Sequence, residues 1–233
     1  MSKSKAHTIY KLAGGTRVPG VTTVCGVLDK PALLAWANRI GLEGIEMRRY
    51  VDDKADIGTL AHAMIVADLK GEKADTSDYS ENQIKQAKWA CGSFYDWLNG
   101  HKVKLIWAEQ PLVSEFHRYG GTPDIFALVD GKSELVDLKT GSGIYPEHLT
   151  QVAGGYDILV TENEFQPSQI KILNIPRTNN ENWGELIVND RQRKLHKELF
   201  LSCLKIYNLK KQIKGETVYP KKHKESEVSK CQQ

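Results

Sequence analysis

The sequence has few cysteines, no long apolar run and little excess charge, and each absence excludes a class of protein. Its four cysteines are widely scattered and include no C-x-x-C pair, which argues against a zinc or iron–sulfur site. No apolar run reaches about 18 residues, so we predict no membrane-spanning segment. The net charge of +3 permits a polyanionic partner but does not by itself indicate one.

The composition is that of one globular domain with reduced thiols. At 233 residues, 40% of them hydrophobic, the chain can bury a substantial core without disulfide bonds. The N-terminus has no apolar core of a leader sequence, so we expect a cytoplasmic location. We assign residues 1–218 to one domain, with a helical region at about 31–99, a sheet core at about 103–190 and a closing helix at about 191–214. The basic segment 219–233 is expected to be a disordered tail.

Turn and capping signals define a helical first half. Glycine and proline turns within residues 8–29 indicate a short hairpin or an extended segment. Ser80, with Gln83 three residues later, resembles a capping box and begins a helix that Gly100 ends. Two more helices are expected in this half: 31–40, with a buried apolar face, and Ile57 to about Leu69.

The second half is rich in predicted strands. These are Val103–Trp107, Glu109–Val113, Ile125–Val129, Leu135–Leu138, Gln169–Ile175 and Glu185–Val188. A helix is expected after Pro146, and Asp190 is expected to cap a final helix that runs from Arg191 to about Lys214. We therefore predict an α/β fold with a central mixed β-sheet flanked by helices.

The hairpin around Asp130-Gly131 is the most informative segment. This dipeptide is favoured in two-residue type I′ turns, and here it separates two apolar, strand-like runs. If these two residues form the loop, the strand register places Asp124 opposite Asp137. Lys139 lies two residues beyond Asp137 and therefore points to the same face.

Two acids and a lysine on one sheet face have two interpretations. They form a solvated surface, in which a four-residue loop would pair Asp124 with Lys139, or they form a site for a divalent metal. Neighbouring carboxylates repel each other, and a bound Mg²⁺ turns that repulsion into binding. Glu134 lies on the opposite face of its strand from Asp137, so we do not count it as a ligand.

Other polar residues could complete such a site. His62 follows Gly58 at the start of an expected helix, and the glycine lets another backbone approach closely. A structural role is the alternative for this imidazole, which as a ligand would suit Mn²⁺ as well as Mg²⁺. Glu109, on the strand before the hairpin, is either a further ligand or a solvent-facing acid. Gln151 and Tyr156 are five residues apart on one helix and would share a face only loosely.

Direct signs of nucleic-acid binding are few. The five tryptophans, including Trp183, are interpreted as core residues rather than as base-stacking platforms. Three lysines and His223 form a basic cluster in the tail, which would strengthen phosphate binding only in a salt-dependent way.

Four motifs in order resemble those of a known enzyme family. Gly58-Thr-Leu-Ala-His62, Gly121-Thr-Pro-Asp124, Asp137-Leu-Lys139 and Gln151 resemble the motifs of the PD-(D/E)xK nuclease superfamily, and specifically its RecB-like exonuclease branch. The segment Pro19-Gly-Val-Thr-Thr-Val24 is similar to phage-encoded members and to the mitochondrial genome-maintenance exonuclease group. The branch has a Q-x-x-x-Y motif, whereas Gln151 and Tyr156 are one residue further apart, and Gly155 takes the place of the tyrosine.

The resemblance implies a restriction-endonuclease-like core and a role for each motif residue. The implied metal ligands are His62, Asp124, Asp137, the backbone carbonyl of Leu138 and, as an additional ligand, Glu109. Lys139 would orient or activate the attacking water and offset developing charge, and Gln151 belongs to the same catalytic set. The residues expected to contact nucleic acid are Thr22, Thr23 and Tyr156. The implied cofactor is Mg²⁺ or Mn²⁺, and no iron–sulfur cluster is expected because the late cysteine cluster of such members is absent.

We therefore predict a divalent-metal-dependent DNA exonuclease that hydrolyses phosphodiester bonds in phage-type replication, recombination or repair. Its preference for single-stranded ends, the choice of DNA and a location in the bacterial host cytoplasm follow from the resemblance. The alternatives are a structure-specific or restriction-type endonuclease on the same core and, less favoured, a non-catalytic nucleic-acid-binding protein. DNA with single-stranded or duplex ends is the expected partner, and no membrane partner is expected.

Overall fold

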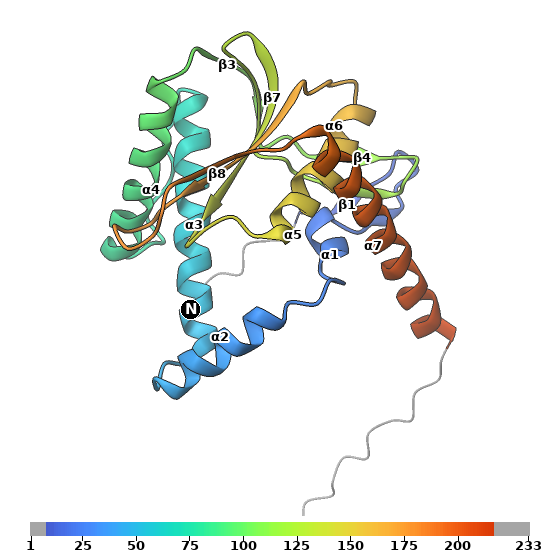
Figure 1. The fold of residues 1–233 in the computed structure, drawn as a ribbon, viewed down its shortest axis with the longest axis horizontal. Coiled ribbons are helices and arrows are strands. Elements are labelled where there is room, and N and C mark those ends of the chain that lie inside the picture. The colour runs from blue at the N-terminus through green and yellow to red at the C-terminus, as the bar shows by residue number, and fades with distance from the viewer. Residues whose placement is uncertain (1–7, 217–233) are drawn as a thin grey trace, which may run out of the picture.

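A mixed β-sheet forms the centre of the computed structural model, which describes residues 8–216 (Figure 1). Its five strands are β3 (Val103–Ala108), β6 (Ile125–Val129), β7 (Lys132–Thr140), β8 (Gln169–Ile175) and β9 (Gly184–Ile187). They lie in the order β3-β6-β7-β8-β9, and every neighbouring pair is antiparallel except β7 with β8, which is parallel. The predicted α/β fold with a central mixed sheet is confirmed.

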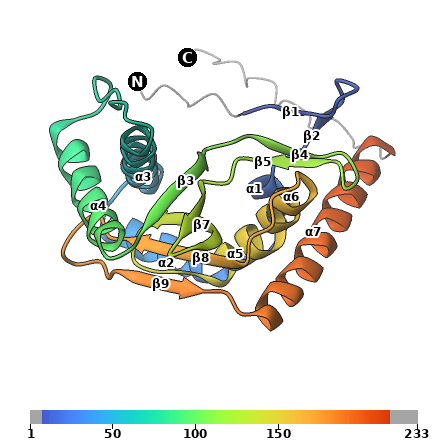
Figure 2. The ribbon, with the colours of Figure 1, turned by 90° about the horizontal axis from the view of Figure 1, so that it is seen from above.

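Helices cover both faces of the sheet (Figure 2). One face packs against α3 (Met47–Leu69) and α4 (Glu81–Asn99). The other packs against α1 (Val21–Cys25), α7 (Asp190–Glu216) and one continuous helical segment. That segment consists of α5 (Pro146–Leu149), the π-helix η1 (Thr150–Tyr156) and α6 (Asp157–Glu162). Because both faces are covered, the sheet interior is dry, and a polar group on it needs a specific reason.

The two-residue turn of the hairpin is confirmed. Asp130 and Gly131 have φ angles of +50° and +83°, as a type I′ turn requires. The β6–β7 ladder runs from Val129 opposite Lys132 to Ile125 opposite Val136. The four-residue loop is therefore excluded, and the register directs Asp124 toward Asp137 at the end of the ladder.

Buried ion pairs fix α7 to α6. The fully buried Asp157 accepts a 2.7 Å hydrogen bond on Oδ1 from Arg193 Nη2, and Arg193 Nε donates to its Oδ2. Lys197 Nζ lies 2.8 Å from the same Oδ2. Asn189, and not the predicted Asp190, caps α7, because its side chain accepts from the Gln192 backbone N–H.

Two helices in the first half differ from the predictions. α3 begins at Met47, well before Ile57. The Glu46 side chain caps it by accepting hydrogen bonds from the backbone N–H groups of Arg48 and Arg49. α2 (Pro31–Leu42) lies below the sheet beside the first turns of α3 (Figure 1). Its Leu34 and Leu42 are 76% and 81% exposed, so the predicted buried apolar face is wrong.

The small hairpins also refine the predictions. β1 (Tyr10–Lys11) pairs with β2 (Arg17–Val18), which confirms a short hairpin within residues 8–29. The next segment, Val21–Cys25, is helical because Val21 and Val24 face the core below it. β4 (Leu112–Ser114) pairs with β5 (Tyr119–Gly121). Glu109 precedes β4, is exposed and has a φ of +50°, so its predicted place on a strand is wrong.

None of the helices within residues 8–216 has the length and apolar character needed to cross a membrane. The predicted tail 219–233, with its basic cluster, lies outside the described residues. Cys25, Cys91 and Cys203 are buried free thiols.

Candidate active site

The second half of β7 places Asp137 and Lys139 on the face of the sheet that η1 covers. The Asp137 side chain is 1% exposed, and its Oδ2 lies 2.7 Å from Lys139 Nζ. Neither oxygen of Asp137 has an aligned hydrogen bond from any residue in the described part of the chain. A buried carboxylate in this state costs free energy, and a bound cation would remove that cost.

Asp124 lies immediately before β6, where the ladder to β7 ends. Its Oδ2 accepts a 2.8 Å hydrogen bond from the Leu138 backbone N–H. The N–H and C=O of one strand residue point to the same side, so the Leu138 carbonyl also faces this end of β6. The Glu109 backbone N–H donates to the Asp124 carbonyl at 2.7 Å and holds the loop in place.

His62 reaches this site from the middle of α3. Its Nδ1 lies 3.6 Å from Asp124 Oδ2. A Cβ on Gly58, one turn earlier, would overlap Thr140 Oγ1, so glycine lets α3 approach the end of β7 without displacing this side chain. The expected close approach is confirmed, although it involves a side chain rather than a backbone.

Burial and charge set the ionisation of the four groups. Burial raises the pKa of Asp137 to about 6, and the nearby Asp124 carboxylate adds to this rise, although Lys139 opposes it. Burial alone would lower the pKa of Lys139, but the two carboxylates outweigh it and raise that pKa. Burial also opposes the ionisation of His62 and Asp124, but their mutual attraction dominates, so the pKa of His62 is raised and that of Asp124 is lowered.

The chemistry of these donors suits a hard divalent cation. Two carboxylates, one imidazole and one backbone carbonyl are ligands for Mg²⁺ or Mn²⁺, and neither Asp137 oxygen has an aligned hydrogen bond from the described residues. No three His, Cys, Asp or Glu side chains within residues 8–216 are gathered closely enough to hold a metal ion. His62 with Asp124 and Lys139 with Asp137 instead form two neighbouring pairs.

Gln151 and Tyr156 are adjacent because the segment between them is a π-helix. In η1 the i→i+5 pattern brings residues five apart together. The Gln151 side-chain amide donates a 3.0 Å hydrogen bond to the Tyr156 hydroxyl. The expectation of loose alignment is wrong, because it assumed the α-helical period. Burial, followed by the charges of Asp137 and Asp124, raises the pKa of Tyr156 well above its usual value.

The G-T-P-D segment makes room for this tyrosine. A Cβ on Gly121 would lie 2.8 Å from Tyr156 Cε1, so a larger residue would displace the ring. The next residue, Thr122, shares a 2.9 Å hydrogen bond with the Tyr10 hydroxyl. Thr22 and Thr23 are exposed on α1, and no described residue hydrogen-bonds to their hydroxyls.

The two remaining acids lie away from the pairs. The exposed Glu109 side chain makes no hydrogen bond or ion pair with residues 8–216, so only its backbone contacts the site. Glu134 is buried on the opposite face of β7, as predicted, where Lys171 Nζ lies 3.1 Å from its Oε2. Lys171 also bonds to Glu185 and lies over the Trp97 ring.

Two neighbours of the site were not predicted. The Tyr10 hydroxyl is connected to the site by its hydrogen bond with Thr122, and no sequence signal links these two distant positions. His148 on α5 accepts from the Tyr145 backbone N–H, and burial followed by the Lys139 charge lowers its pKa to about 4. Its position shortly before Gln151 was the signal that could have identified it.

The chain matches no protein-family model and no curated protein. Solved structures give weak similarities. A candidate exonuclease from Eubacterium rectale is 13% identical over 83% of this chain and 77% of that chain, with a TM-score of 0.38. The alkaline exonuclease of Laribacter hongkongensis is 13% identical over 85% and 94%, with a TM-score of 0.34. The same exonuclease in complex with dAMP is 14% identical over 67% and 85%, with a TM-score of 0.31.

Proposed function

We propose that the protein is a divalent-metal-dependent deoxyribonuclease of the PD-(D/E)xK superfamily that hydrolyses phosphodiester bonds. The observation that carries this proposal is the Asp137 carboxylate, which is buried next to Asp124 and whose one close polar contact among the described residues is the ion pair with Lys139. Such an arrangement destabilises the protein when no ligand is bound. Binding of a metal cation together with a phosphate group would compensate these charges.

The residues that would hold the metal are Asp124, Asp137, His62 and the Leu138 carbonyl. Bound Mg²⁺ or Mn²⁺ would supply an activated water and would neutralise charge on the phosphate. The chain itself supplies the ammonium of Lys139, which the carboxylates keep charged and hold in place for a water or a phosphate oxygen. Gln151 and the protonated Tyr156 present hydrogen-bond donors beside the same acids.

We infer that free DNA ends are the substrate, with single strands preferred. The end of β7 points toward the side of the sheet where α1, α2 and α5 lie, so these helices border the approach to the site (Figure 1). Exposed basic side chains on α2, at its N-cap and in the first turn of α3 suit a phosphate backbone: Lys30, Arg39, Arg48 and Arg49. The resemblance of the segment 19–24 to phage-encoded nucleases is the basis for proposing a role in DNA replication, recombination or repair.

The test is cleavage of end-labelled linear DNA with Mg²⁺ or Mn²⁺ by the wild type and by Asp124→Ala and Asp137→Ala. Both variants should be folded and inactive, whereas Asp96→Ala, which removes an exposed acid on α4, should retain full activity. Robust metal-dependent cleavage by either site variant would overturn the proposal.

Substrate topology distinguishes the alternatives. An exonuclease spares a circular single strand and degrades the linear form, whereas an endonuclease on the same core cuts both. A protein that binds both forms without cutting either would be a non-catalytic DNA-binding protein. Retention of both acids and the lysine in one buried cluster favours catalysis.

A further inference from the structure

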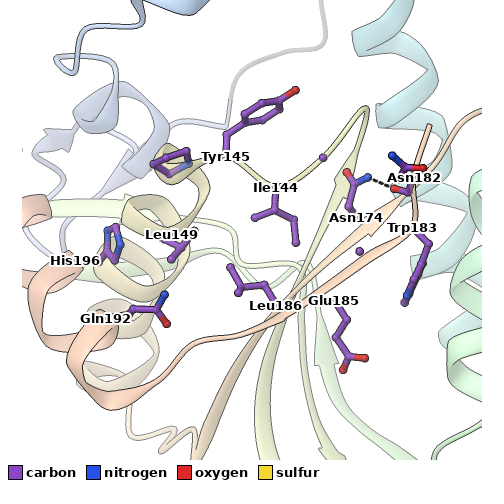
Figure 3. A pocket seen from close by; sticks show the side chains of 13 residues that line it. Ile144, Tyr145, Leu149, Asn174, Asn182, Trp183, Glu185, Leu186, Gln192 and His196 are labelled. Atoms are coloured by element: carbon purple, nitrogen blue, oxygen red, sulfur yellow. Dashed lines mark hydrogen bonds between the residues drawn. The ribbon is translucent and has the colours of Figure 1, made fainter. Parts of the chain in front are cut away.

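A cavity of about 510 Å³ lies next to the candidate active site (Figure 3). It is bounded by the segment between β7 and α5, by β8, by the start of β9 and by the first turns of α7. Cavities of about 300–1,000 Å³ commonly hold small organic ligands. The volume therefore suits one nucleoside-sized group.

Asn174 connects the cavity to the catalytic face. It pairs with Lys139 in the parallel ladder, so the two side chains lie on the same face of adjacent strands. Neighbouring strands in a sheet are about 4.8 Å apart. The buried Asn174 amide donates to the carbonyls of Gly141, at 2.9 Å, and Asn182, at 2.7 Å. The second of these bonds is drawn in Figure 3. One side chain thus fixes both loops that border the cavity, one strand away from Lys139.

The cavity wall combines an apolar floor with an aromatic side chain at the edge. Ile144 and Leu186 face each other across it, and Leu149 extends the apolar surface (Figure 3). Tyr145 is 46% exposed at its edge. Trp183 is 41% exposed and is not the core residue that we predicted, but its side chain lies on the Glu185 side of β9, opposite Leu186 (Figure 3). An exposed aromatic ring beside an apolar floor suits the flat face of a nucleobase.

The polar groups of the wall suit a base rather than a phosphate. Among the described residues that line it there is no lysine or arginine, and its carboxylate, Glu185, is paired with Lys171 outside the wall. Gln192 and Asn182 supply amides, which can hydrogen-bond to the edge of a base. The phosphate-binding charge lies instead at Lys139, on the neighbouring strand.

We propose that this cavity binds one unpaired nucleobase of the DNA strand whose phosphate lies at Lys139. The proposal rests on the proposed function and deepens it, because it assigns a base-binding subsite to the same active site. A base inside the cavity is separated from a complementary strand, so the subsite selects single-stranded or frayed ends.

Binding without metal tests the subsite independently of catalysis. The probes are dAMP and deoxyribose 5-phosphate, which lacks the base, titrated calorimetrically in EDTA. The wild type should bind dAMP between about fivefold and a hundredfold more tightly, the range that one stacked base provides. Tyr145→Ala, which removes the aromatic ring at the edge, and Gly184→Leu, which fills the cavity, should each abolish this preference. A Cβ on Gly184 would meet its nearest neighbours at 3.6 and 3.7 Å, which are ordinary van der Waals contacts, so it would fit without a clash.

The matched control is Trp89→Ala, which removes a 52% exposed tryptophan from α4 and should keep the preference. Equal binding of the two probes by the wild type, or an unchanged preference in both cavity variants, would refute the subsite. A wild type that prefers dAMP but cleaves no DNA with Mg²⁺ would support the subsite and refute the proposed nuclease. DNA cleavage without any base preference would refute the subsite alone.

Discussion

Replacement of Asp137 by asparagine should make the metal-free protein more stable while it removes activity. The Asp137 side chain is 1% exposed, has no aligned hydrogen bond from the described residues and lies near a second carboxylate. Asparagine has nearly the same shape and cannot ionise. Asp137→Asn therefore removes the charge and leaves the packing unchanged.

The size of the effect follows from the pKa. The pKa of Asp137 is about 6 in the folded protein and 3.8 in the unfolded chain. At about 1.4 kcal/mol for each tenfold change in the ionisation constant, ionised Asp137 costs the fold up to about 3 kcal/mol. Asparagine leaves Lys139 with Asp124 as its remaining nearby carboxylate and brings an amide that also needs partners, and both effects subtract from this value. We therefore expect a net gain of about 1 kcal/mol.

The sign of the pH dependence is fixed by the direction of the shift. Below pH 3.8 Asp137 is protonated in both states and costs nothing. As the pH rises through the window from 3.8 to about 6, the unfolded state loses its proton first, so the wild type loses stability relative to the variant. Above that window the difference is constant.

Urea unfolding in EDTA at about pH 8 and about pH 4 measures this difference. The variant should be more stable at the higher pH and nearly equal to the wild type at the lower one. Asp96→Asn, at an exposed position, should match the wild type at both. An Asp137→Asn variant that is less stable at pH 8, or a difference that does not change with pH, would refute the reasoning.

Three further predictions concern the supports of the site. Gly58→Ala should lower the stability measured by thermal unfolding by about 1–3 kcal/mol, because the new Cβ meets Thr140 Oγ1. The same change should be neutral or stabilising in a Thr140→Ala background, and a loss of stability in both backgrounds would contradict this. Tyr156→Phe should lower the free energy of unfolding by about 0.5–1.5 kcal/mol, because the Gln151 amide loses its acceptor, and it should also slow DNA cleavage. An unchanged cleavage rate would show that the pair has no catalytic role. Asp157→Ala should cost about 3–5 kcal/mol in urea unfolding, because it leaves two cations of α7 without their partner, and a change below about 1 kcal/mol would refute that role.

The hairpin and its facing residues could be predicted because they depend on local chemistry. Asp130-Gly131 fixes the turn, the turn fixes the register, and strand alternation then separates Glu134 from Asp137. The capping box of Ser80 and Gln83 is equally local, and the structure confirms it.

The features that could not be predicted depend on contacts between distant segments. η1 adopts its period where the backbone packs against α7: a Cβ on Gly154 would lie 2.5 Å from the His196 carbonyl oxygen and 2.7 Å from Phe200 Cβ. Trp183 is exposed because β9 is the edge strand of the sheet, which the sequence of β9 does not reveal. Similarly, nothing in α2 itself indicates that it lies apart from the sheet.

The π-helix has a consequence for changes in chain length. A π-turn holds one residue more than an α-turn, so it absorbs an inserted residue without rotating the helical segments on either side. Leu149 before η1 and Asp157 after it both face inward, toward the cavity and α7 respectively. Removal of one residue from within η1 would thus convert it to an α-turn, and the side chains of α5 and α6 would keep their present orientations. The same deletion in α3 or α4 would instead rotate every following side chain of the helix away from the core.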